Sequence, residues 1–173
     1  MVLRTLTLSS LACAGLVACQ SLSRPAGLEL PLEARSGSQV RGTVRLTPVD
    51  QGLRVQAEIE GLRPLAEHGF HVHERGDCSA PDASSAGGHY NPQGAPHGPA
   101  GMPGQAHHAG DMPNLRADSA GRARYETTLA GLSLEGALGV LGRSVVVHRD
   151  ADDYRSQPAG NSGPRIACAV IRR

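Results

Sequence analysis

The sequence predicts an all-β fold: a Greek-key antiparallel β-sandwich, or flattened eight-stranded barrel, with one long loop held by metal and a disulfide. Short runs of apolar residues alternate with polar ones along the chain without a convincing helix between them. That period of two belongs to strands with one buried face. The 22 glycines and 12 prolines also favour turns and strands over a helical bundle. Greek-key connections are found in most β-sandwiches.

The first strands are expected soon after residue 28. Apolar residues alternate over 28–32, over 40–46 and, most regularly, over 53–60. Asp50 and Gly52 lie between the last two runs and predict a hairpin turn. Further strands are expected over 69–74, 122–130, 144–149 and 165–171.

One long segment, 76–121, has no sustained period and is rich in Gly, Pro, Ala and Ser. Loops of this length inside a compact domain are unusual unless they have a function or are disordered. Ordering such a backbone costs roughly 1–2 kcal/mol per residue. We therefore expect a metal ion and a disulfide to hold it.

The N-terminal segment predicts export. It carries one positive charge, at Arg4, and an apolar run that ends in LVAC at Cys19, a pattern typical of a signal peptide and of the bacterial lipobox. We expect 1–18 to be a signal peptide, Cys19 to be lipidated and 19–27 to be a tether before a domain at 28–173. The protein would then lie in the cell envelope, on the periplasmic or extracytoplasmic side, anchored to a membrane. The apolar run is too short for a spanning helix.

Two alternatives remain for this segment. The signal could be an ordinary secretory one that is cleaved nearby, and Cys13 could be offered as the lipobox cysteine.

If Cys13 leaves with the signal and Cys19 takes lipid, Cys78 and Cys168 remain in the domain. Two cysteines in an oxidising compartment predict one disulfide, worth roughly 4–5 kcal/mol in the chain-entropy description. Free buried thiols are the alternative.

Charge excludes some classes of function. All 17 basic residues are Arg and they nearly balance 16 acidic residues, without a basic block that would indicate a nucleic-acid surface. We expect no nucleic-acid partner and membrane contact only through the lipid anchor. The absence of Lys also excludes a lysine Schiff base or general base.

Six of the eight histidines fall into metal-ligand spacings. Imidazole is the commonest protein metal ligand. His71 and His73 are two apart on a predicted strand, so their side chains leave the same face. His148 ends another apolar strand and could meet them across the sheet. Such a nitrogen-rich set suits copper or zinc.

A second set lies in the long loop. It offers three imidazoles and one carboxylate, which suits a closed structural zinc site. His107 adjoins His108 and could replace it as a ligand. The set is His89, His97, His108 and Asp111.

Five motifs then carry a specific resemblance. They are HGFHVHE at 68–74, GGHYNP at 87–92, HAGD at 108–111, SVVVH at 144–148 and GPRIAC at 163–168. In order and spacing they resemble the copper,zinc superoxide dismutase family over about residues 28–173.

The resemblance implies a role for each matching residue. The copper ligands would be His71, His73, His89 and His148, and the zinc ligands would be His89, His97, His108 and Asp111. His89 would therefore bridge the two ions. Arg165 would attract superoxide, Asp152 would link a copper-site histidine to a zinc-site histidine, and Cys78 and Cys168 would form the disulfide. His68 matches a structural histidine.

The implied activity is dismutation of superoxide to oxygen and hydrogen peroxide by a redox-cycling copper beside a structural zinc, one of each per subunit. That activity would protect the cell envelope from superoxide. A homodimer is the oligomer considered, although no residue pattern selects it. A protein that only binds or stores copper or zinc is the main alternative, and a zinc hydrolase is a weaker one because it needs an open zinc position.

Overall fold

The computed structural model describes residues 27–173, so the predicted signal peptide, Cys19 and most of the tether lie outside the described residues. Within the described part, nine strands and one 3-10 turn follow in order. They are β1 (Leu28–Ala34), β2 (Arg41–Val49), β3 (Gly52–Glu60), β4 (Glu67–His68), β5 (Phe70–His73), η1 (Ser84–Ala86), β6 (Leu115–Arg116), β7 (Ala123–Ala130), β8 (Ser144–His148) and β9 (Arg165–Val170).

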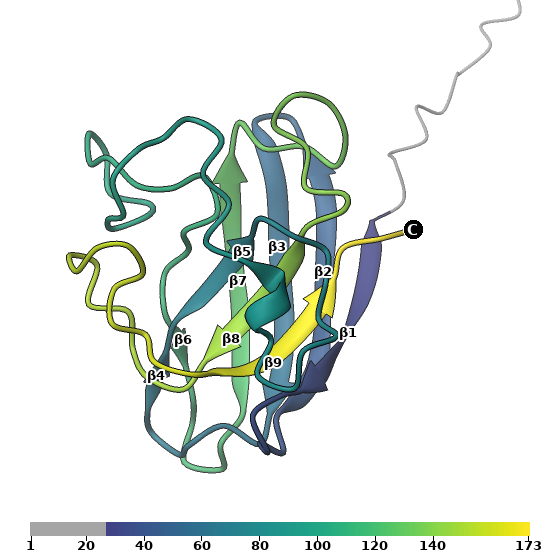
Figure 1. Ribbon diagram of the computed structural model, residues 1–173, viewed down its shortest axis with the longest axis vertical. Helices are drawn as coiled ribbons and strands as arrows, with labels where there is room; N and C mark the ends of the chain where they lie inside the picture. The colour runs from purple at the N-terminus through teal and green to yellow at the C-terminus, as the bar shows by residue number, and fades with distance from the viewer. Residues whose placement is uncertain (1–26) are drawn as a thin grey trace, which may run out of the picture.

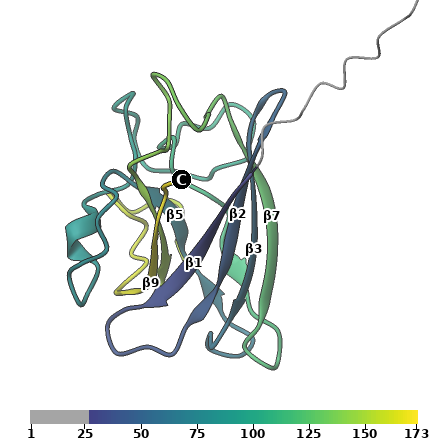
Figure 2. The same ribbon diagram turned by 90° about the vertical axis from the view of Figure 1, so that its right-hand side faces the viewer.

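Seven of the strands form one antiparallel sheet in the order β5-β8-β9-β1-β2-β3-β7. The sheet curls so that β5, β8 and β9 face β2, β3 and β7 as two layers (Figures 1 and 2). β1 joins the layers, since it pairs with β2 along most of its length and with β9 only at Glu33 and Ala34. The chain crosses between layers from β3 to β5 and from β7 to β8. The predicted Greek-key β-sandwich is confirmed.

The core fills the space between the layers. Apolar residues at alternate positions of each strand point inward, for example Val44 on β2, Val55 on β3 and Val147 on β8, all without exposed surface. β5 and β7 are the two edges of the sheet, and the rings of Phe70 and Tyr125 meet edge to face with centroids 5.3 Å apart. This aromatic contact closes the barrel where no strand pairing does.

The outward positions of β5 and β8 are buried as well. On these strands every residue is buried, because the inward side chains are apolar and loops cover the outward ones, which include three histidines. Val146 faces outward into a small second cluster with Ala83, Ala86 and the two cysteines. A strand buried on both faces explains why 145–147 is a continuous valine run.

The predicted disulfide is present between Cys78 and Cys168, with an S–S distance of 2.03 Å. It ties the long loop to β9 across a separation of 90 residues. Arg35 reinforces the same junction, because its Nε donates to the Cys78 carbonyl at 2.8 Å. The loop is thereby fixed close to its start.

The predicted hairpin is also present, since β2 ends at Val49 and β3 begins at Gly52. Gly52 has φ 157°, and an added Cβ would lie 2.2 Å from the Leu129 carbonyl oxygen, which no other residue could tolerate. β4 and β6 were not predicted. Each has two residues, too short to show a period.

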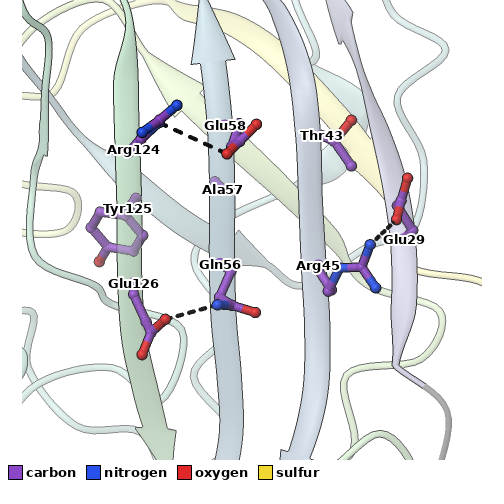
Figure 3. Close-up of a pocket in the computed structure, with 9 residues that line it drawn as sticks. All are labelled: Glu29, Thr43, Arg45, Gln56, Ala57, Glu58, Arg124, Tyr125 and Glu126. Carbon is purple, nitrogen blue, oxygen red and sulfur yellow. Dashed lines mark hydrogen bonds and ion pairs between the residues drawn. The ribbon is translucent and has the colours of Figure 1, made fainter.

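The outer face of β1, β2, β3 and β7 is polar. A shallow hollow of about 610 Å³ on this face is crossed by pairs between neighbouring strands (Figure 3). Gln56 donates to Glu126 at 2.8 Å, Arg45 pairs with Glu29, and Arg124 lies 3.9 Å from Glu58. Exposed pairs of this kind keep a sheet face solvated and add little stability.

Among residues 27–173, no helix is long and apolar enough to cross a membrane.

Candidate metal centre

The long loop docks on the free edge of β5. Val72 donates its backbone N–H to the Gly110 carbonyl at 2.9 Å and accepts from the N–H of Tyr90 at 2.8 Å. Isolated bridges place His71 opposite Asp111 and His73 opposite His89. The loop residues are thus brought beside the strand histidines by backbone pairing, and the edge strand is covered.

The close approach depends on a small residue. An added Cβ at Gly110 would lie 2.3 Å from the Val72 carbonyl oxygen and 3.1 Å from the Tyr90 Cβ. The glycine of the HAGD motif therefore allows the loop to reach the edge of β5.

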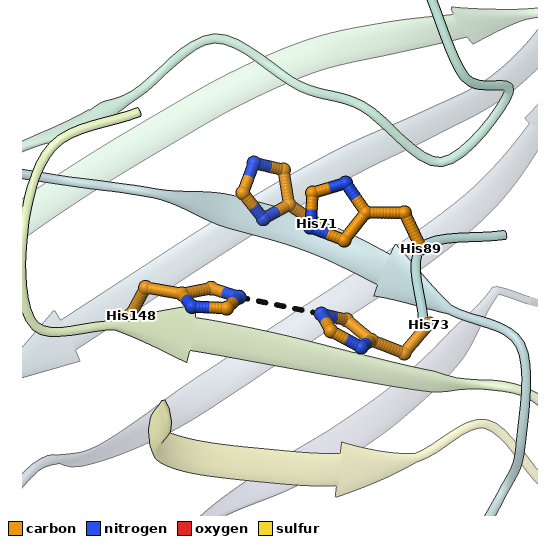
Figure 4. A group of neighbouring side chains, drawn as sticks. All are labelled: His71, His73, His89 and His148. Atoms are coloured by element: carbon orange, nitrogen blue, oxygen red, sulfur yellow. Dashed lines mark hydrogen bonds between the residues drawn. The ribbon is translucent and has the colours of Figure 1, made fainter. Parts of the chain in front are cut away.

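Two groups of ligand-type side chains result, and every member is buried. In each group the candidate ligand atoms all lie within 4.8 Å of one another. The first group combines three strand histidines with one from the loop (Figure 4), and the second lies in the loop. The groups are His71, His73, His89 and His148, and His89, His97, His108 and Asp111.

Hydrogen bonds set the tautomers of the first group. His73 Nδ1 donates to the Gly87 carbonyl at 2.9 Å and His148 Nδ1 donates to the Gly163 carbonyl at 3.1 Å, since carbonyl oxygens only accept. In the neutral rings both Nε2 atoms then carry lone pairs, and these atoms face each other at 3.3 Å (Figure 4). His71 donates from Nε2 to Asp152 at 2.8 Å, which leaves a buried Nδ1 without a partner. These nitrogens fit a cation.

The second group converges on the carboxylate of Asp111. His89 Nδ1 lies 2.8 Å from Oδ1, and His108 Nδ1 lies 3.4 Å from the same oxygen. His97 Nδ1 is 2.9 Å from Oδ2 but is not aligned with it as a hydrogen bond. Three imidazoles and one carboxylate in a closed, buried set match the ligand types of a structural zinc site.

His89 belongs to both groups. Its Nδ1 faces Asp111 in the second group, and its Nε2 is buried without a hydrogen-bond partner in the first. A single ring therefore presents one nitrogen to each group.

The carboxylate of Asp152 connects the two groups by hydrogen bonds. Its Oδ2 accepts from His71 Nε2 at 2.8 Å and its Oδ1 accepts from His97 Nε2 at 2.9 Å. This carboxylate is thus hydrogen-bonded to one ring of each group. An added Cβ at Gly160, where φ is +62°, would lie 1.8 Å from Oδ1, so a side chain there would displace the carboxylate.

Sequence reasoning missed Asn114, which holds Asp152. Its Oδ1 accepts from the Asp152 N–H and its Nδ2 donates to the Asp152 carbonyl, both at 2.9 Å. No local spacing marks this residue, because the two positions are 38 residues apart.

Arg165 lies beside the first group. It is the register partner of His148 on the neighbouring strand. Its guanidinium donates to the carbonyls of Ala83 and Gly87, both at 2.6 Å, and the Gly87 carbonyl also accepts from His73. The positive charge is therefore held at a defined place next to the histidines, half-buried rather than free in solvent.

Burial and charge move the pKa values of these groups. Burial lowers the pKa of His71 to about 4 and lowers the pKa values of His73 and His148 well below 6.5, so these rings are neutral at neutral pH. Neutral imidazole is the metal-binding form. Burial opposes charge on His97 too, but the carboxylates of Asp111 and Asp152 outweigh it and raise its pKa to about 9. A cation between these carboxylates is favoured, whether a proton or a metal ion.

The other two histidines lie outside both groups. His68 is buried and donates from Nδ1 to the His148 carbonyl at 2.9 Å, which fits a structural role. His107 donates from Nδ1 to the carbonyl of His108 at 2.7 Å. The structure places His108, not His107, beside Asp111.

Comparison with known proteins agrees with this geometry. The family model described as copper/zinc superoxide dismutase matches residues 40–171. The chain belongs to the copper/zinc superoxide dismutase family. It is 40% identical to a superoxide dismutase [Cu-Zn] of Deinococcus radiodurans, with 98% of this chain and 97% of the relative covered. It is also 42% identical to superoxide dismutase [Cu-Zn] 2 of Aquifex aeolicus, over 78% of this chain and 80% of that one.

A solved structure shows the same fold. The crystal structure of an SOD-like protein from Bacillus subtilis superposes with a TM-score of 0.76 at 37% identity, covering 85% of this chain and all of that one. Copper/zinc superoxide dismutases use copper and zinc, and the two buried groups described above have ligand types that fit these ions.

The lowered histidine pKa values predict acid sensitivity of the metal-free protein. A ring that titrates at about 4 when folded and at about 6.5 when unfolded gives stability that is complete above pH 6.5 and is lost as the pH falls toward 4. For His71 alone the loss is about 3 kcal/mol. Urea unfolding of metal-free protein between pH 7 and 4 measures it.

His71→Gln should make this dependence shallower, because one of the titrating rings is then absent. A free energy of unfolding that stays constant from pH 6.5 to 4 would contradict the prediction.

Proposed function

We propose that this protein dismutates superoxide, converting two superoxide ions and two protons into oxygen and hydrogen peroxide, and that it does so in the cell envelope. The observation that supports the proposal best is the placement of His89, whose two nitrogens serve two adjacent buried groups. A protein that only stores metal would need neither a shared ring nor an arginine beside one group.

The donor atoms follow from the hydrogen bonds. Copper would be held by His71 Nδ1 and by the Nε2 atoms of the other three histidines of the first group, because the opposite nitrogens of His71, His73 and His148 are hydrogen-bonded. Zinc would be held by the Nδ1 atoms of the second group and by Asp111. Bound copper supplies one-electron oxidation and reduction, chemistry that none of these side chains provides.

The protein's own residues would supply position and charge. Asp152 holds the rings of His71 and His97 in fixed orientations. Nε2 of His89, buried and without a partner, would carry a proton only when it does not hold copper. Arg165 would draw an anionic substrate toward the histidines through its positive charge.

The direct test is superoxide dismutation by purified protein reconstituted with copper and zinc. We expect copper-dependent activity that is absent from the metal-free protein and from protein loaded with zinc alone. Stoichiometric binding of both metals without turnover would instead support a binding or storage function. Hydrolase activity of the zinc-loaded protein would instead support the zinc-hydrolase function.

Arg165→Ala should lower kcat/KM by about 10-fold or more, because the local field that attracts the anion is removed. The dependence of the rate on ionic strength should also weaken. Copper content should be retained, since Arg165 is not among the ligands. Arg124→Ala, which removes the same charge from the outer face of β7, is the control. Equal rates for the two variants would exclude a guiding role for Arg165.

We also propose that 1–18 is a signal peptide, that Cys19 carries lipid and that 19–27 tethers the 28–173 domain to a membrane. Mass spectrometry of the mature protein should find an acylated Cys19 at the N-terminus, and Cys19→Ser should release the protein from the membrane fraction. Cys13→Ser should leave the protein in the membrane fraction. An unmodified N-terminus at another residue would contradict the anchor.

We propose a homodimer as the assembly to test. Among the described residues, Leu65 and Met102 are the large apolar side chains with extensive exposure, 78% and 58%. Two such side chains do not mark an apolar dimer interface.

A further inference from the structure

We propose that Gln157 is a positioning residue for His97, the proposed zinc ligand. The proposal rests on the proposed function, because it concerns the same zinc group. Gln157 lies in the segment between β8 and β9, 60 residues from His97 along the chain.

The side-chain amide of Gln157 pairs with the backbone of His97. Oε1 accepts from the His97 N–H at 2.8 Å and Nε2 donates to the His97 carbonyl at 2.9 Å. His97 belongs to no strand, and within residues 27–173 its N–H and carbonyl have no other hydrogen-bond partner. One amide therefore does for His97 what a neighbouring strand would do, because it supplies an acceptor and a donor side by side.

The orientation of the His97 backbone decides where its ring points. The buried ring donates from Nε2 to Asp152 at 2.9 Å, and its Nδ1 lies 2.9 Å from Asp111 Oδ2 without an aligned hydrogen bond. If the backbone turned, one of these contacts would have to break. Holding both backbone groups thus holds Nδ1 in the zinc group.

The arrangement is reciprocal between two loops. Asn114, at the end of the long loop, pairs its amide with the backbone of Asp152 in the segment after β8. Gln157, from that second segment, pairs its amide with the backbone of His97 in the long loop. The two clamped residues are joined to each other through His97 Nε2 and Asp152 Oδ1. Each loop therefore orders the other around the zinc group.

The test is the affinity of metal-free protein for Co²⁺, used as a zinc probe and followed by its visible absorption. Gln157→Ala should weaken binding about 10- to 100-fold, the usual effect of removing a residue that orients a ligand. Gln157→Glu keeps the size and the acceptor but cannot donate to the His97 carbonyl, so Co²⁺ binding should be weakened in this variant as well. Gln56→Ala, on the outer face of β3, is the matched control and should bind as the wild type does.

Urea unfolding of the metal-free variants separates positioning from bulk stability. We expect Gln157→Ala and Gln56→Ala to unfold at similar urea concentrations and to differ in Co²⁺ affinity. Wild-type affinity in both Gln157 variants would overturn the proposal while leaving the proposed function intact. Failure of the wild-type protein to bind Co²⁺ or Zn²⁺ would overturn the proposed function and this inference with it.

Discussion

Buried imidazole nitrogens that carry lone pairs and have no hydrogen-bond donor facing them impose the main constraint on this structure. The Nε2 atoms of His73 and His148 are 3.3 Å apart, and each neutral ring already donates its one N–H, on Nδ1, to a carbonyl. Leaving such polar atoms unpaired costs on the order of 1–3 kcal/mol each. A bound cation removes that cost and turns the facing lone pairs into ligands. The nitrogens of this group are thus arranged so that they could accept a cation.

The metal centre and the apolar core lie on opposite faces of the same strands. The inward side chains of β5 and β8 complete the apolar core, while His71, His73 and His148 are among the outward ones. Loops rather than another sheet cover the outward face. The Cys78–Cys168 disulfide and the pairing of Tyr90 and Gly110 with Val72 hold that cover in place. Three of the candidate ligands therefore lie on strands, and the positions of the others depend on how the loops are held.

Much of the fold was predictable because strands have a local signature. The alternation over 53–60 became β3, and the valine run before His148 became β8. The two-residue strands β4 and β6 were missed, because a period cannot be read from two residues. The bridges that dock the long loop on β5 were missed for a related reason. They involve residues in a segment without a pattern, and the pairing exists only once β5 has an open edge.

The candidate metal ligands could be predicted from the sequence. Two histidines lie two apart on a predicted strand, and a histidine–aspartate set lies in a loop rich in glycine and proline. Spacing indicated the pair His71 and His73, because side chains two apart on a strand share a face, whereas the loop set was predicted from residue type and the sharing of His89 from the family resemblance. Which nitrogen of each ring faces inward, and that Asn114 and Gln157 hold Asp152 and His97, emerged only in the folded molecule. Those features depend on hydrogen bonds between segments 38 and 60 residues apart, and no local period encodes contacts at such a distance.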